Sequence, residues 1–150
     1  MNSHDDAKYR LDLALGYAKE AEDDLSTERW WACVSNAQVA IENAGKALIA
    51  CFEPVEKVHE LVPQLERLLK REQLPDALRR TLAGLVPIFA RHGHGEHIKS
   101  TYGDDSTRTP PWQIYKTDDA RRAVTDMQTV IRTAQQVMDD YFKSTNAETP

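Results

Sequence analysis

The sequence has little of several features, and each scarcity excludes a class of protein. Only 2 of its 150 residues are cysteine, too few for the disulfide framework of a small secreted domain. Its strongest apolar runs, such as 47–52, are far shorter than the roughly 20 residues that a membrane-spanning helix needs. The segment MNSHDDAKYR has no apolar stretch after a basic start, so we expect no secretory signal.

The two cysteines, Cys33 and Cys51, fall on one predicted helix. At the rise of an α-helix they are about 27 Å apart there. They therefore cannot form a disulfide with each other on that helix. A reducing, cytoplasmic location is the simplest expectation.

Positive charge is also scarce. The chain has 19 Lys and Arg against 24 Asp and Glu, a net charge of −5 and a pI near 5.5. This balance excludes a general electrostatic nucleic-acid binder, so any contact with RNA must depend on a local patch. Charged residues make up 29% and hydrophobic residues 41%, which is typical of a soluble globular protein and not of a disordered one.

Helical periodicity is what the sequence does contain. Two segments, 5–25 and 28–52, repeat apolar side chains at steps of three and four residues, the mark of one helix face. In the second segment small residues widen this face, so more than one neighbouring helix must cover it. Glu53-Pro54 should end that helix, because the residue before a proline disfavours the helical conformation.

Two shorter helices are predicted next. One starts near His59 or Glu60, with Pro63 tolerated in its first turn. The other covers 76–90, where Pro87 should kink the helix or end its regular part early.

A long loop is predicted over 103–116, before a last helix that Thr117 caps. These patterns predict an all-α protein, an up-and-down bundle of four or five helices with a long loop before the last helix. We expect a single domain over 1–150, with its core at about 5–142 and a polar tail over 143–150.

The stretch ARHGHGEH holds three of the five histidines within six residues. In it Arg91 and His97 are separated by five residues. A guanidinium can hold two phosphate oxygens, and an imidazole can remove the proton of a ribose 2′-hydroxyl. Arg91 and His97 are therefore candidate catalytic residues for RNA cleavage by internal attack. The candidates to bind phosphate or base beside them are His92, His94, Lys99 and Tyr102.

Several motifs, in order, resemble the HEPN domain family, named for higher eukaryotes and prokaryotes nucleotide-binding. SNAQVAIENAGKALIACF resembles the family signature in which Glu42 and Lys46 follow small residues. KVHELVPQL resembles its Thr-His-x-Leu motif, with His59 and Leu61 in place. TYGDD, PPWQIY and TDDARRAV resemble the segment before the last helix. Together they cover about 9–142.

The resemblance implies a helical bundle that forms a homodimer. Many relatives pair with a small nucleotidyltransferase in toxin–antitoxin systems, and many are metal-independent ribonucleases with an Arg-x(4–6)-His motif, which Arg91 and His97 match. We therefore expect a HEPN homodimer that binds nucleotide or RNA and is a candidate metal-independent endoribonuclease. We expect a small nucleotidyltransferase as a partner. We expect neither association with a membrane nor a cofactor.

Two alternatives stay open. The first is a non-catalytic HEPN module that binds a nucleotide or a small nucleotidyltransferase. The acidic balance favours it, as do the two glycines in the motif and Lys99, which stands where the toxin branch carries a tyrosine. The second is a zinc or nickel site on His92, His94 and His97. No strict ligand spacing is present, so we predict no metal.

Other side chains receive structural interpretations. Glu42 and Lys46, four residues apart, are most simply a pair on the helix surface, although the family signature leaves open a role in anchoring the bundle or the dimer. His59 is interpreted as a helix cap and not as a catalyst. Trp112 and Tyr115 are expected to hold the long loop against the bundle.

Overall fold

A computed structural model describes residues 3–147 of the chain. Within this range the protein is helical and has no β-strand, and the one bridge of extended backbone joins Asp104 to Thr109. The predicted all-α class is therefore confirmed. The helices are α1 (Ser3–Ser26), α2 (Trp30–Ala50), α3 (Val62–Leu69), α4 (Asp76–Arg91), α5 (His94–Tyr102), α6 (Pro111–Ile114) and α7 (Thr117–Ala147).

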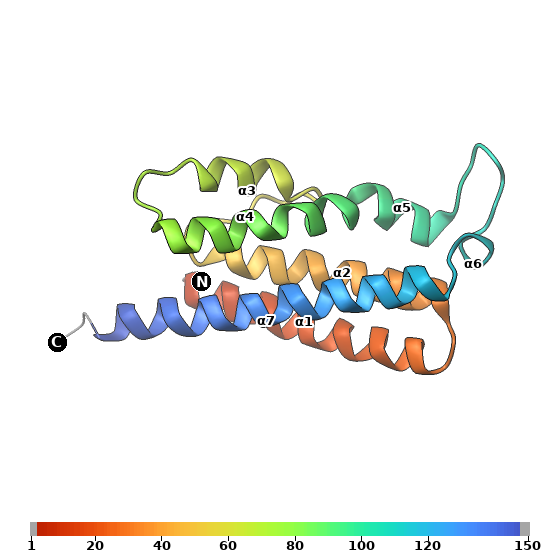
Figure 1. The fold of residues 1–150 in the computed structure, drawn as a ribbon, viewed down its shortest axis with the longest axis horizontal. Coiled ribbons are helices and arrows are strands. Elements are labelled where there is room, and N and C mark those ends of the chain that lie inside the picture. Colours follow the sequence, from red (N-terminus) through yellow and green to blue (C-terminus); the bar gives the residue numbers. More distant parts are fainter. Residues whose placement is uncertain (1–2, 148–150) are drawn as a thin grey trace.

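Helix α2 lies at the centre of the bundle (Figure 1). It contacts α1 and α7 over much of its length, and α5 covers its first half. Helices α4 and α5 run end to end in one layer with α3, above α2 and α7 in the view of Figure 1. Because neighbours surround it, α2 is buried on every side from residue 40 onward, as its wide apolar face predicted.

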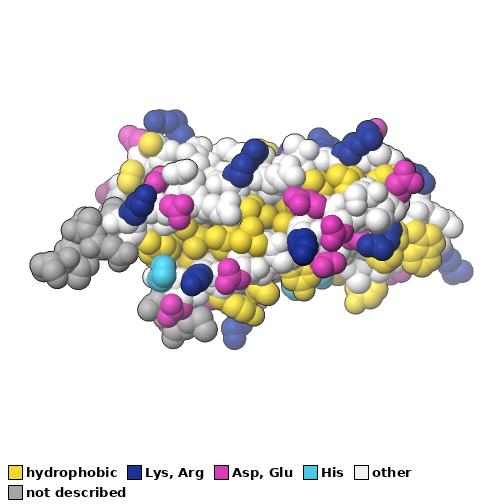
Figure 2. Space-filling view, turned by 90° about the horizontal axis from the view of Figure 1, so that it is seen from below, with side chains coloured by type: hydrophobic (Ala, Val, Ile, Leu, Met, Phe, Trp, Pro, Cys, Tyr) yellow, Lys and Arg dark blue, Asp and Glu magenta, His cyan; other side chains and the backbone are white. Residues whose placement is uncertain are grey.

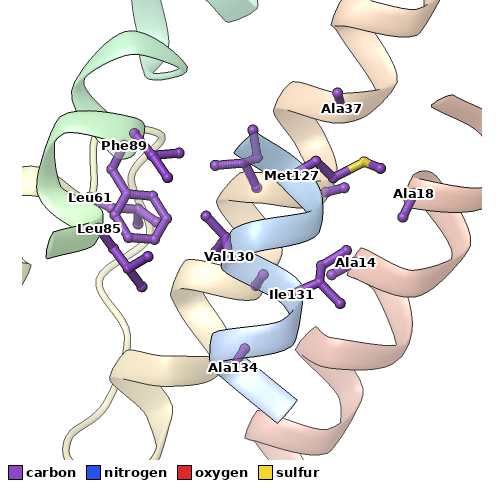
Figure 3. Close-up of a cluster of buried hydrophobic side chains, with 14 of the residues drawn as sticks. Ala14, Ala18, Ala37, Leu61, Leu85, Phe89, Met127, Val130, Ile131 and Ala134 are labelled. Carbon is purple, nitrogen blue, oxygen red and sulfur yellow. The ribbon is translucent and has the colours of Figure 1, made fainter. Parts of the chain in front are cut away.

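The two sides of α2 are packed with side chains of different size (Figure 3). Toward α1 the contacts come from small residues such as Ala14 and Ala18, which let the helices approach closely. Toward α4 the space is filled by Leu61, Leu85 and Phe89.

Several helix boundaries differ from the predicted ones. Helix α3 begins at Val62, later than expected, with Pro63 in its first turn. Helix α4 does not end early, because it continues through Pro87 to Arg91. Both Pro87 and Ala83, whose carbonyl loses its usual partner, are exposed, so water can replace the missing hydrogen bond.

The predicted long loop contains the short helix α6. The helix before this loop is α5, and its first residues belong to the histidine-rich stretch. At the other end of the chain α7 continues into the predicted polar tail as far as Ala147. The rest of that tail, 148–150, lies outside the described residues.

The face formed by α1 and α7 carries hydrophobic side chains along its middle (Figure 2). A shallow groove there is lined by Leu15 and Ala18 of α1 and by Met127 and Ile131 of α7. Among the described helices, none combines the length and the apolar character that crossing a membrane would require.

Candidate functional site

The histidine-rich stretch forms the junction between α4 and α5. Helix α4 ends at Arg91, and His92 and Gly93 link it to α5, which begins at His94. A Cβ on Gly93 would lie 2.8 Å from a carboxylate oxygen of Glu60. Glu60 is exposed and its carboxylate is the end of a flexible side chain, so it could move aside for a larger residue at this position.

His92 is buried between two carboxylates. Its Nε2 lies 2.7 Å from Oδ2 of Asp126, and its Nδ1 lies 2.6 Å from Oε1 of Glu96. Ionised carboxylates only accept hydrogen bonds, so both ring nitrogens donate and the ring is an imidazolium. Burial alone would lower the pKa of His92, but the hydrogen bonds and charges of Glu96 and then Asp126 raise it above its usual value.

Arg91 meets the same carboxylate as His92. Its Nη2 and Nε lie 3.1 and 3.4 Å from Oδ2 of Asp126. The arginine side chain is 38% exposed. Asp126 therefore ties the end of α4 to α7, and it is a site residue that sequence reasoning missed. The available signal was a carboxylate next to Met127, inside the apolar repeat of the last helix.

His97 faces α2, where Gln38 determines its tautomer. Gln38 is fully buried, and its Nε2 lies 3.2 Å from the carbonyl of His92 and 3.3 Å from Oε2 of Glu42. Both partners are acceptors, so the amide nitrogen must face them and Oε1 must face Nδ1 of His97, 3.1 Å away. His97 therefore carries a proton on Nδ1, and in the neutral ring Nε2 holds the free lone pair.

His59 forms part of a stack of imidazole rings. Its centroid lies 4.9 Å from that of His97, with 11° between the ring planes, and 5.8 Å from that of His94. Its Nδ1 lies 3.2 Å from Oε1 of Glu42. The N-cap of α3 is Leu61, so the interpretation of His59 as a helix cap is wrong.

Glu42 and Lys46 are buried, so their interpretation as a surface pair is also wrong. They are 7% and 8% exposed, and Lys46 Nζ lies 2.7 Å from Oε1 of Glu42. A Cβ on Gly45 would lie 2.6 Å from side-chain atoms of Leu61 and Phe89, so glycine lets the layer above approach α2 here. The available signal was a row of polar residues one turn apart on an otherwise apolar helix, namely Gln38, Glu42 and Lys46.

The remaining predicted binding residues lie on α5. His94 and Lys99 are exposed, and Tyr102 is 70% exposed at the end of the helix. Of the two aromatic residues expected to hold the long loop, Tyr115 is buried, whereas Trp112 is 62% exposed and meets Trp31 edge-on. Tyr115 and the buried Pro111 thus hold the loop against the bundle.

The sequence also offered histidines as possible metal ligands and two cysteines. Among the described residues, no group of three or more His, Cys, Asp or Glu side chains is arranged to hold a metal ion. The stacked imidazoles lie face to face and do not converge on one point. Cys33 and Cys51 are both unpaired, and burial raises the pKa of each thiol to about 12, which keeps them protonated at neutral pH.

The predicted residues form two linked groups. Arg91 and His92 meet on Asp126, whereas His97 lies with His59. No hydrogen bond or ion pair joins Arg91 to His97 in the described part of the chain. Gln38 connects the groups, because it bonds both the backbone of His92 and the ring of His97.

Comparison with known proteins agrees with this architecture. The sequence profile of the HEPN domain matches residues 7–137. Among solved structures, the chain is similar to the protein TT1696 from Thermus thermophilus, with 20% sequence identity and a TM-score of 0.65. The alignment covers 91% of this chain and 98% of that one, and at this identity the likeness concerns the fold alone. No curated protein matches the sequence significantly.

Proposed function

The chain belongs to the HEPN domain family, and we propose that it is a metal-independent endoribonuclease with Arg91 and His97 as catalytic residues. The observation that carries this proposal is the hydrogen bond between Nδ1 of His97 and the buried amide of Gln38. It assigns the single free lone pair of the neutral ring to Nε2. A positioned imidazole of this kind can act as a general base.

The proposed reaction is an internal transfer of the phosphodiester. Nε2 of His97 removes the proton of the ribose 2′-hydroxyl, and the 2′-oxygen attacks the adjacent phosphorus. The bond from phosphorus to the 5′-oxygen of the next nucleotide breaks as that oxygen takes up a proton. The products are a 2′,3′-cyclic phosphate and a 5′-hydroxyl end.

Arg91 is the proposed phosphate ligand. Asp126 accepts hydrogen bonds from Nε and Nη2 of the guanidinium, which orients the group without burying it. Its exposed part can bind the phosphate oxygens as negative charge builds on them. His92 is not exposed to substrate, so we assign it the task of holding Asp126 and the turn beside Arg91.

The exposed residues of α5 are the proposed binding surface for the rest of the RNA. Lys99 can pair with a neighbouring phosphate, and Tyr102 can stack on a base. His94, at the outer end of the imidazole stack, is the third candidate.

We further propose that the protein acts in the cytoplasm as a homodimer, and as one half of a toxin–antitoxin pair with a small nucleotidyltransferase. The groove between α1 and α7, where apolar side chains lie among charged ones, supports an additional protein contact (Figure 2). Sedimentation of the purified protein tests the dimer, and co-purification with the nucleotidyltransferase tests the pair.

The decisive experiment measures cleavage of a single-stranded RNA by the purified protein in excess chelator. Arg91→Ala and His97→Ala are tested beside it. We expect cleavage that survives the chelator and is lost in both variants, with cyclic phosphate ends on the product. Arg80→Ala removes an exposed arginine from the same helix, α4, and is the matched control for a lost positive charge; it should keep most of the activity.

The second candidate is a non-catalytic HEPN module that binds a nucleotide or a small nucleotidyltransferase. The observation that favours it is the ion pair to Asp126, which engages Arg91 before any substrate arrives. The net charge of −5 also disfavours the binding of a polyanion such as RNA. A folded dimer that cleaves no RNA, yet binds such a partner, would establish this function instead.

A further inference from the structure

We propose that His59 is the general acid of the reaction, so that each protomer carries both proton-transfer groups within one chain. This inference rests on the proposed ribonuclease function and names a residue that the Arg-His motif does not contain. It arises from the stacked pair of His59 and His97 and from the way α2 anchors both rings.

The two imidazoles are anchored in parallel. Gln38 and Glu42 lie one turn apart on α2, about 6 Å along the helix axis. Gln38 bonds Nδ1 of His97, and Glu42 bonds Nδ1 of His59. The ring planes differ by only 11° and the centroids are 4.9 Å apart, so the rings stand side by side along α2.

This anchoring determines which nitrogens remain for chemistry. Because each Nδ1 faces α2, each Nε2 lies on the far side of its ring and is turned away from that helix. The side chain of His59 is 53% exposed, so its Nε2 can be reached from solvent. Two imidazole nitrogens are therefore presented next to each other, as the two ends of a phosphodiester displacement require.

The hydrogen-bond partners on α2 also indicate which ring is the proposed base and which is the proposed acid. His97 bonds a neutral amide, which leaves it suited to accept a proton as the base. His59 bonds the carboxylate of Glu42, whose negative charge pairs with the ring when it is protonated. Lys46 pairs with the same carboxylate and offsets its charge in a buried setting. The ring beside the carboxylate is thus the one assigned to carry a proton to the substrate.

The proton balance closes without a further reactant. Neutral His97 takes the proton of the 2′-hydroxyl as the 2′-oxygen bonds to phosphorus, and protonated His59 gives its proton to the departing 5′-oxygen. The enzyme ends with His97 protonated and His59 neutral, and exchange with water restores both. No electron transfer takes place.

A change of leaving group tests this role directly. RNA has an alkoxide leaving group that needs a proton, whereas the nitrophenolate of a ribonucleoside 3′-(para-nitrophenyl phosphate) leaves without one. We expect His59→Gln to slow RNA cleavage by about 100-fold or more, but to slow release of nitrophenolate by less than about threefold. We expect His97→Gln to slow both by about 100-fold or more, because both reactions need the base.

His4→Gln is the matched control, since it removes an exposed imidazole at the start of α1, where the ring lies against Phe142 and outside the stack. It should leave both rates within about threefold of the wild type. Nitrophenolate release at the normal rate by His59→Gln also reports a folded site, so misfolding cannot imitate the expected result. Equal losses on both substrates, or no loss on either, would overturn the role of His59.

Mixing inactive variants tests whether both groups act in one chain. His59→Gln and His97→Gln are combined, unfolded and refolded together so that protomers can exchange. If acid and base act in one protomer, mixed dimers stay inactive on RNA. Recovered cleavage would show that the groups meet across two protomers and would overturn the proposal. A wild type that cleaves neither substrate would instead overturn the ribonuclease function itself.

Discussion

His92 and His97 lie in the same short motif, and their surroundings differ in almost every respect. His92 is 5% exposed and donates hydrogen bonds from both nitrogens to ionised carboxylates. His97 is half-buried, bonds a neutral amide through one nitrogen and lies against another imidazole. The comparison shows that partners on distant helices, here α7 and α2, hold one histidine through both ring nitrogens and the other through Nδ1 alone.

The largest expected difference between the two histidines is their contribution to the stability of the fold. His92→Gln should lower the free energy of unfolding by about 3 kcal/mol, because Glu96 and Asp126 lose the imidazolium between them in a buried setting. Arg91 still pairs with Asp126, which keeps the loss from being larger. Urea denaturation measures it.

His97→Gln is the control for that prediction. It removes an imidazole from the same motif but leaves no buried charge unpaired, so its loss should stay below about 1 kcal/mol. Equal losses in the two variants would contradict the distinction between the structural role of His92 and the catalytic role proposed for His97.

The next effect separates what Gln38 does for the two histidines. Gln38→Leu should lower the free energy of unfolding by about 2 kcal/mol, because the buried carbonyl of His92 loses its side-chain donor. It should also slow RNA cleavage by about tenfold per folded molecule, because His97 loses the acceptor that selects its tautomer.

Gln38→Glu sharpens that prediction. It keeps an acceptor for Nδ1 of His97 but no donor for the carbonyl of His92, and it adds a charge beside Glu42. We expect a similar loss of stability with cleavage per folded molecule within about threefold of the wild type. A cleavage rate as low as that of Gln38→Leu would show that tautomer selection is not the reason.

A smaller effect is the dependence of stability on pH that His92 produces near neutral pH. Its pKa in the folded protein lies above its ordinary value of 6.5, so the stabilisation is fully present below that value. As the pH rises, the unfolded state loses its proton first, and stability falls until the pH passes the folded-state pKa. The slope is at most about 1.4 kcal/mol per pH unit.

Urea denaturation across this pH range measures that slope. His92→Gln should abolish it, whereas His97→Gln should keep it. If the slope persists in His92→Gln, another group is responsible for it.

The smallest effect concerns the exposed rim of the site. Lys99→Ala should leave the melting temperature unchanged, since the side chain is exposed. It should weaken RNA binding equally for all sequences and reduce the slope of log affinity against log salt by about 0.7 for a single strand. An unchanged slope, measured by fluorescence anisotropy in a salt series, would remove Lys99 from the binding surface.

The fold was predictable because helical periodicity is a local property. The apolar repeat of α7 extends over many turns, and each position reports the same face. The failures fall where local signals conflict with packing. Glycines at 93 and 95 suggested a loose stretch, yet α5 begins between them, at His94. Pro87 was expected to kink its helix or end the regular part early, and the helix continues through it to Arg91, with Pro87 on the exposed side.

The candidate site was predictable only in part. Arg91 and His97 lie close together in the chain, so the motif is visible in the sequence. Asp126 and Gln38 come from other helices, and no sequence spacing relates them to the histidines. Glu42 was assigned to the surface because an acidic residue four positions before a lysine is ordinarily solvent-exposed. It is buried because a second layer of helices covers α2 on that side.

The sequence by itself determined that the chain is a helical bundle of the HEPN type, and it located the stretch that holds the candidate chemistry. Only the tertiary structure decided what each histidine there can do. An imidazole changes its protonation and tautomer with the groups that contact it, and those groups lie 59 positions away for His97 and 34 positions away for His92. Packing brings them together, whereas periodicity reports only which face of a helix is buried.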